Sequence, residues 1–132
     1  MTHPEAEDLG QLSGLQLAIM RAIWQRGEAS TAEVVASLAD SRDLAHTTVG
    51  TMLSRLERRG LIESRKAGKH LVYRATVAET EVKRSMVSEF LDRLFDGDAK
   101  ALVAHLVRER DVRDTDLDKV RELLKKKGSD HV

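Results

Sequence analysis

The chain has 132 residues, of which 33% are charged, with 22 basic and 22 acidic side chains and a formal net charge of zero. This length suits one domain or two small ones. The absence of cysteine excludes disulfides, thiolate metal sites and thiol catalysis. We expect a cytoplasmic protein, because the sequence has no apolar run of about eighteen residues and its polar, acidic start MTHPEAEDLG does not resemble a signal peptide.

Two capping boxes predict where the first two helices begin. Ser13 with Gln16 fits a Ser-x-x-Gln box, and the apolar positions behind it continue to Gly27. Ser30 with Glu33 repeats the pattern at the start of a short second helix. Residues 40–45 then form a short connection to a third helix. A short connection between these two helices indicates a helix-turn-helix, with the first helix closing the core behind it.

The third helix has one apolar stripe and one polar face. The stripe is formed by Val49, Met52, Leu53 and Leu56, which are spaced as i, i+3, i+4 and i+7. The opposite face carries Thr47, Thr51, Ser54 and Arg58, with Gly50 and Arg55 at its flanks. Small hydroxyl residues allow close approach to base edges and arginines reach phosphates, so this face suits the DNA major groove. Gly60 is predicted to end the helix as its C′ residue.

Gly50 lies inside this helix, where a glycine costs about 1 kcal/mol relative to alanine. One explanation is close packing against a neighbouring element. The other is that the missing side chain lets the helix sit against DNA. The sequence leaves both explanations open.

A β-hairpin with a basic tip is predicted after Gly60. Leu61 and Ile62 open the first strand, residues 67–69 make the turn, and residues 71–73 return. Residues 44–75 hold seven basic and two acidic side chains, a net charge of +5, against −4 for residues 1–43 and −1 for residues 76–132. A helix, a strand, a basic turn and a strand outline a winged helix-turn-helix, and the local positive charge favours a nucleic-acid partner.

Three further helices are predicted in residues 76–132. Thr76 and Glu79 are expected to cap a long helix that Gly97 ends, and apolar periodicity marks two more helices around residues 99–107 and 117–124. So short a segment makes a poor core alone, so we expect it to form a homodimer interface; ordinary packing against the first domain is the alternative. The predicted interface residues are Met86, Val87, Phe90, Leu91, Leu94, Phe95, Leu102 and Leu106.

Signatures of catalysis are missing from the sequence. The five histidines include no pair at i, i+3 or i+4, so we expect no metal site. Nothing resembles a nucleophile elbow or a phosphate loop, so we expect no cofactor and no enzyme activity. Two other classes stay open beside a DNA-binding regulator. One is a winged-helix regulator controlled by a small ligand, and the other is a winged-helix protein–protein module.

The combination of motifs resembles the BlaI/MecI (penicillinase repressor) family over about residues 12–125. The matching positions are Leu12, Ser13, Leu15, Ile19, Met20, Trp24, Gly27, Thr47, Thr48, Val49, Thr51, Met52, Leu53, Arg55, Leu56, Gly60, Leu61, Tyr73, Phe90, Leu91, Leu94, Phe95, Gly97, Leu102, Val103, Leu106, Val107, Leu117, Val120, Leu123 and Leu124. The resemblance implies a bacterial, dimeric repressor of its own operon on a palindromic operator. In the best-known members that operon confers β-lactam resistance. Some relatives sense copper through a cysteine-rich motif, and this chain has no cysteine.

The family's DNA contacts carry over onto named positions. The start of the base-reading helix aligns with Thr47, Thr48, Gly50 and Thr51, where staphylococcal-type members carry an arginine at the position of Gly50. Because of that difference at Gly50, the operator sequence of the staphylococcal-type members does not carry over to this chain. The wing contacts align with Arg65, Lys66, Lys69 and Tyr73.

The resemblance also implies release of repression by a membrane sensor protease. Family members are cut in the second C-terminal helix at a motif resembling Leu-Val-Leu-Asn-Phe. Here residues 102–106 read Leu-Val-Ala-His-Leu, which makes His105 and Leu106 the candidate cleavage position.

The predicted fold is mainly α with a small β-hairpin. We expect a flexible N-terminus over residues 1–11 and a winged helix-turn-helix DNA-binding domain over residues 12–76. A three-helix dimerisation domain is expected over residues 77–127, followed by a flexible tail over residues 128–132.

Overall fold

The computed structural model describes residue 9, residues 11–110 and residues 112–129, the last three without their side chains. The chain divides into two compact units within one helix, between Glu89 and Phe90. Most of the predicted flexible N-terminus and part of the predicted tail lie outside the described residues. Leu9, within that N-terminal stretch, is buried in the core of the first unit. Within the described residues, no helix has the length and apolar character needed to cross a bilayer.

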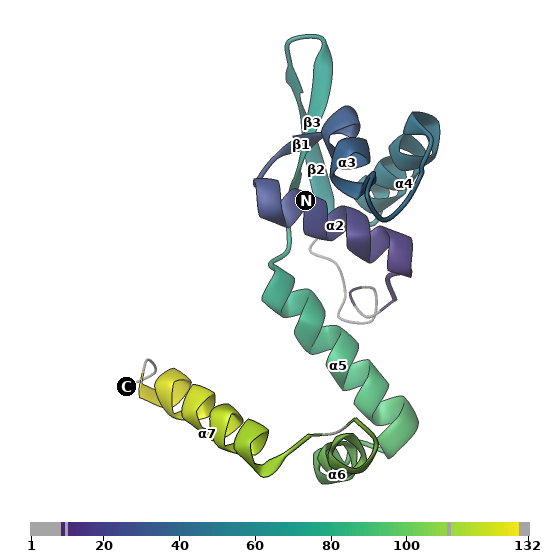
Figure 1. The fold of residues 1–132 in the computed structure, drawn as a ribbon. Helices are drawn as coiled ribbons and strands as arrows, with labels where there is room; N and C mark the ends of the chain where they lie inside the picture. The colour runs from purple at the N-terminus through teal and green to yellow at the C-terminus, as the bar shows by residue number, and fades with distance from the viewer. Residues whose placement is uncertain (1–8, 10, 111, 130–132) are drawn as a thin grey trace. The chain divides into compact units, whose positions relative to one another are not determined.

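The first unit is a winged helix (Figure 1). Its elements are α2 (Gly14–Arg26), β1 (Ala29–Ser30), α3 (Thr31–Leu38), α4 (His46–Arg58), β2 (Ile62–Ala67), β3 (His70–Ala75) and the first turns of α5 (Glu79–Phe95). The three strands form an antiparallel sheet in the order β1-β3-β2. The β2–β3 hairpin extends beyond the helices as the wing, as predicted. The two-residue strand β1 was not predicted from the sequence.

Both predicted capping boxes are confirmed. At α2 the Ser13 hydroxyl accepts from the Gln16 N–H at 3.1 Å, and the Gln16 side chain accepts from the Ser13 N–H at 3.0 Å. At α3, Ser30 and Glu33 make the same pair of bonds at 3.2 and 3.0 Å. Hydrogen bonds from the Ser30 backbone and from the Arg26 side chain lower the pKa of Glu33. These caps fix the register at which each helix presents its apolar side to the core.

Gly60 ends α4 in a Schellman motif. Its φ of +82° is a left-handed conformation, its N–H donates to the Glu57 carbonyl at 2.9 Å, and the Leu61 N–H donates to the Leu56 carbonyl at 3.1 Å. Leu56 and Leu61 are both fully buried. This tight reversal directs the chain from the end of α4 straight into β2.

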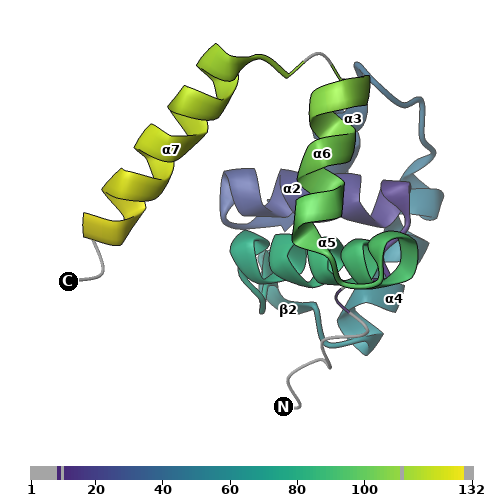
Figure 2. The ribbon, with the colours of Figure 1, turned by 90° about the horizontal axis from the view of Figure 1, so that it is seen from below.

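The core of the first unit is aliphatic, in agreement with the 3% aromatic content. The largest fully buried side chains come from all its helices and from the hairpin: Ile19, Met20, Ile23, Val34, Val49, Leu53, Leu56, Leu61, Ile62 and Val82. The Trp24 indole N–H donates to the Val77 carbonyl at 3.0 Å. That bond and the burial of Val82 hold the first turns of α5 beside α2 (Figures 1 and 2).

The predicted cap of α5 is wrong. The Thr76 hydroxyl donates instead to the Gly60 carbonyl, and the Thr76 N–H donates to the Leu61 carbonyl at 2.9 Å. The helix begins at Glu79, where the Glu81 side chain accepts from the Ala78 N–H at 3.3 Å. Thr76 is therefore used to join the end of β3 to the end of α4, which sequence spacing alone does not reveal.

The second unit comprises the rest of α5, α6 (Ala99–Glu109) and α7 (Asp114–Ser129). Gly97 ends α5 as predicted, with a φ of +80°, and the Asp98 carboxylate caps α6 by accepting from the Lys100 and Ala101 N–H groups at 3.0 and 3.2 Å. The Phe95 ring lies 5.8 Å from the His105 ring in an edge-on arrangement. No residue of α6 is buried, and large apolar side chains of this unit face solvent.

Candidate nucleic-acid interface

Helix α4 turns its polar face to solvent. Val49, Leu53 and Leu56 are fully buried and fix the rotation of the helix about its axis. The predicted contact residues of this helix other than Gly50 are all exposed: Thr47, Thr48, Thr51, Ser54, Arg55 and Arg58. Along this exposed surface the hydroxyl groups, from Thr47 to Ser54, therefore precede the guanidinium groups of Arg55 and Arg58.

The N-terminus of α4 has no side-chain cap. Ala45 occupies the N-cap position with φ −68° and ψ 144°, and its side chain has no oxygen that could accept from the first-turn N–H groups. Helices α2 and α3 both have complete capping boxes. Uncapped N–H groups and the positive end of the helix dipole suit an anion such as a phosphate.

The hydroxyl of Thr51 makes a hydrogen bond within the helix. Its Oγ1 donates to the Thr47 carbonyl at 2.9 Å. Thr51 is exposed and its oxygen keeps its accepting capacity, so the side chain can accept a hydrogen bond or pack against a thymine methyl group.

Gly50 is half-buried, unlike its polar neighbours. A Cβ added at Gly50 would lie 4.0 Å from the Thr31 Cγ2 atom, at the start of α3. That distance is an ordinary van der Waals contact. A Cβ would therefore fit at this position, so close packing against α3 does not by itself require the glycine.

The wing carries two exposed lysines near its tip. Gly68, with a φ of +65°, and Lys69 form a two-residue turn between the paired residues Ala67 and His70, a pattern typical of a type II′ hairpin. Lys66 and Lys69 are both exposed. Neither makes an ion pair with any residue that the structure describes.

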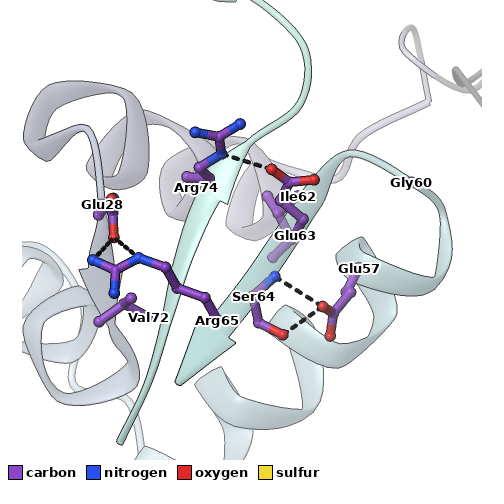
Figure 3. A pocket seen from close by; sticks show the side chains of 9 residues that line it. All are labelled: Glu28, Glu57, Gly60, Ile62, Glu63, Ser64, Arg65, Val72 and Arg74. Carbon is purple, nitrogen blue, oxygen red and sulfur yellow. Dashed lines mark hydrogen bonds and ion pairs between the residues drawn. The ribbon is translucent and has the colours of Figure 1, made fainter. Parts of the chain in front are cut away.

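The arginines of the wing are paired with acids. Arg65 bonds to Glu28, and Arg74 bonds to Glu63 across the two strands (Figure 3). Glu57, from α4, accepts from the N–H and the hydroxyl of Ser64 at 3.0 and 2.6 Å. Glu28 and its bond to Arg65 were not predicted, because the two residues are 37 positions apart.

Tyr73 does not lie with the other predicted contact residues. Its side chain is only 6% exposed and belongs to the core. Burial raises the pKa of Tyr73, the charge of Glu57 raises it further, and a hydrogen bond with Thr31 opposes the rise. A buried ring cannot reach a phosphate, so we leave Tyr73 out of the interface.

The penicillinase repressor family model matches residues 12–126. The chain belongs to this family. It is 26% identical over 117 residues to a methicillin resistance regulatory protein MecI from Mammaliicoccus sciuri, covering 89% of this chain and 95% of the relative. It is 25% identical over 114 residues to a penicillinase repressor from Bacillus licheniformis, covering 86% and 89% of the two chains. The family is one of transcriptional repressors, not enzymes.

The fold comparison agrees with the family. The solution structure of the DNA-binding domain of the repressor BlaI matches with a TM-score of 0.51 and 28% identity, over 60% of this chain and 93% of that one. The winged-helix fold of the first unit is thus the fold of a penicillinase repressor DNA-binding domain.

Half of the predicted dimer residues of this penicillinase repressor family member are exposed, and the other half are half-buried. Val87 is 55% exposed, Phe90 46%, Leu94 66% and Leu106 39%. Met86, Leu91, Phe95 and Leu102 are half-buried. His105 is exposed on α6 beside Leu106. Among the described residues, no group of three or more histidines, aspartates or glutamates could hold a metal ion.

Proposed function

We propose that the chain is a homodimeric repressor that binds a palindromic operator through α4 and the wing. The observation that carries the proposal is the exposed face of α4, which presents hydroxyls and then arginines beside a wing with a lysine tip. Family membership and the likeness to the BlaI DNA-binding domain support the same conclusion.

The two kinds of side chain on α4 suit two kinds of contact. Thr51 and Ser54 are short enough to approach base edges when α4 enters the major groove. Arg55 and Arg58 are long, exposed and make no ion pair with any described residue, so they suit phosphates. Lys66 and Lys69 on the wing add phosphate contacts beside the groove.

The apolar surface of the second unit supports the dimer. Leu94, Leu123 and Leu124 are each more than 60% exposed, and a chain that kept such side chains in water would give up substantial hydrophobic stabilisation. We assign residues 12–76 to DNA binding and residues 77–127 to dimerisation. Joining two half-site readers makes the second contact intramolecular, which raises avidity by about two to four orders of magnitude.

Release of repression is proposed to occur by proteolysis at His105–Leu106. The position lies on α6, no residue of which is buried in the monomer. A cut there would separate α7 from α5 and weaken the dimer without altering α4. Mass spectrometry of the repressor from induced cells tests this step, and derepression with an intact chain contradicts it.

A groove in the first unit favours one alternative, control by a small ligand. It has a volume of about 230 Å³ and lies between α2 and α5, where Leu17, Trp24, Val82 and Met86 form its apolar lining. A small molecule that raises the melting temperature and releases the chain from DNA would support this alternative over proteolysis.

The proposed function is tested by fluorescence anisotropy with the duplex upstream of the protein's own gene and a scrambled duplex of the same composition. We expect tighter binding to the upstream duplex and a steep fall of affinity with salt, because phosphate contacts release counterions. Arg84→Ala on α5 is a matched control, since it removes an exposed arginine that lies outside α4 and the wing. Equal affinity for both duplexes contradicts sequence-specific repression.

A further inference from the structure

The outer face of the three-stranded sheet carries a network of alternating charges. Ile62 and Tyr73 point into the core, so the next residue along each strand, Glu63 and Arg74, stands on the opposite face. Arg74 Nε bonds to Glu63 Oε1 at 2.6 Å across that pair. A surface pocket of about 500 Å³ opens beside these residues (Figure 3).

Glu28 reaches this network from the other edge of the sheet. It precedes β1, whose Ser30 pairs with Val72 of β3, and Val72 in turn pairs with Arg65 of β2. The Arg65 side chain crosses β3 and places two nitrogens on one carboxylate oxygen of Glu28, Nη2 at 2.7 Å and Nε at 3.0 Å. The strand order β1-β3-β2 is therefore what brings these two side chains together.

This pairing divides the cations of the wing into two kinds. Arg65 and Arg74 are held on the stem by acids, whereas Lys66 and Lys69 near the tip have no ion pair among the described residues. The side chain of Arg65 is 60% exposed and that of Glu28 is 41% exposed. The pair thus lies in solvent, where its partners can exchange.

We propose that Glu28 competes with DNA phosphate for Arg65 and so limits the affinity of the repressor for any duplex. In the free protein the carboxylate holds the guanidinium against the stem of the wing. In the complex Arg65 leaves Glu28 for a phosphate, which its planar fork also fits. Glu28 acts through Arg65 and is a positioning residue; the proposal rests on the function proposed above.

The exchange is physically reasonable because an exposed ion pair is weak. Screening and side-chain entropy leave such pairs little net stability, and a duplex offers many phosphates close together. The free energy needed to break the pair makes binding to any duplex less favourable. Removing Glu28 should therefore strengthen binding.

A double-mutant cycle on a labelled duplex of mixed sequence, at low salt, tests the proposal. The variants are Glu28→Gln, Arg65→Gln and the double variant. Glu28→Ala is added because glutamine keeps an amide that could still bond to Arg65, whereas alanine has no such group. We expect Glu28→Gln to tighten binding about two- to fivefold for each protomer bound when Arg65 is present, the range that one exposed pair can supply. When residue 65 is glutamine, the gain should be clearly smaller.

The control separates the pair from general charge. Asp118→Asn makes the same change of net charge at another exposed ion pair, Asp118–Arg121 on α7, whose side chains are 69% and 73% exposed. Provided that sedimentation shows an unchanged oligomeric state, this variant should have nearly the duplex affinity of the parent. Circular dichroism melting of each variant checks that the fold is intact.

Three outcomes overturn the proposal. Equal gains from Glu28→Gln with and without Arg65 mean that only overall charge matters, and no gain means that Glu28 does not compete; the proposed function survives both. If the parent chain binds no duplex even at low salt, the proposed function and this inference fail together.

Discussion

Replacing Ala45 by aspartate separates the stability of α4 from its contact with DNA. Ala45 stands at the N-cap with extended dihedral angles that aspartate also adopts, and it is exposed, so the new carboxylate can accept from the first-turn N–H groups without a clash. The same carboxylate would occupy the first-turn N–H groups, which otherwise suit a phosphate. The substitution is therefore expected to stabilise the protein and to weaken its binding to DNA.

The magnitudes follow from the missing cap. A side-chain cap in place of alanine contributes about 1 kcal/mol, and a negative charge at a helix N-terminus adds about 0.3–1 kcal/mol. For a domain of this size, each 1 kcal/mol raises the melting temperature by about 4–8 °C. On the duplex, loss of one phosphate contact per protomer should reduce the slope of log K against log salt by about 0.9 per protomer.

The assay pairs thermal unfolding with anisotropy over a salt series, and Ala45→Ser is the matched control because serine caps the helix without charge. Serine should give most of the stability gain and a smaller loss of DNA affinity. Because stability rises while binding falls, unfolding cannot account for the loss. If Ala45→Asp stabilises the helix but leaves affinity and salt slope unchanged, the N-terminus of α4 does not face a phosphate.

Four further substitutions have expected outcomes. Arg58→Ala should weaken binding to all duplexes alike and flatten the salt slope. Thr51→Ala should narrow the difference in binding free energy between the operator and the scrambled duplex by about 1 kcal/mol. Equal loss of affinity for both duplexes would remove Thr51 from the base contacts. Leu94→Glu changes a side chain that is 66% exposed in the monomer, so it should leave the fold intact and dissociate the dimer. If sedimentation at micromolar concentration still shows a dimer, the interface lies elsewhere. The pKa of Tyr73 is raised above its usual 10.0, so the folded state favours the neutral phenol. Denaturant unfolding should therefore show the free energy of unfolding falling as pH rises through about 10. Tyr73→Phe should remove that part of the fall.

Local patterns in the sequence predicted most of the fold. The boxes at Ser13 and Ser30 and the glycine at position 60 each act within a few residues, and each is found where it was expected. The burial of Val49 likewise follows from helical periodicity. These features need no knowledge of distant parts of the chain.

The features that sequence reasoning missed depend on contacts between distant residues. Strand β1 is two residues long, too short for any alternation, and exists because β3 pairs with it. Thr76 has the right residue type for a cap but bonds to Gly60, 16 positions earlier. Glu28, which precedes β1, reaches Arg65 of β2 only because both strands flank β3.

The central claim, that two copies of α4 bind a dyad, is tested most directly by selecting bound duplexes from a random pool with the full chain. We expect the enriched sequences to contain two inverted half-sites whose centres are separated by about 10–10.5 bp or a multiple of it, because a two-fold dimer presents its recognition helices at that spacing. Enrichment of a single unsymmetrical site, or of no sequence at all, would contradict the account.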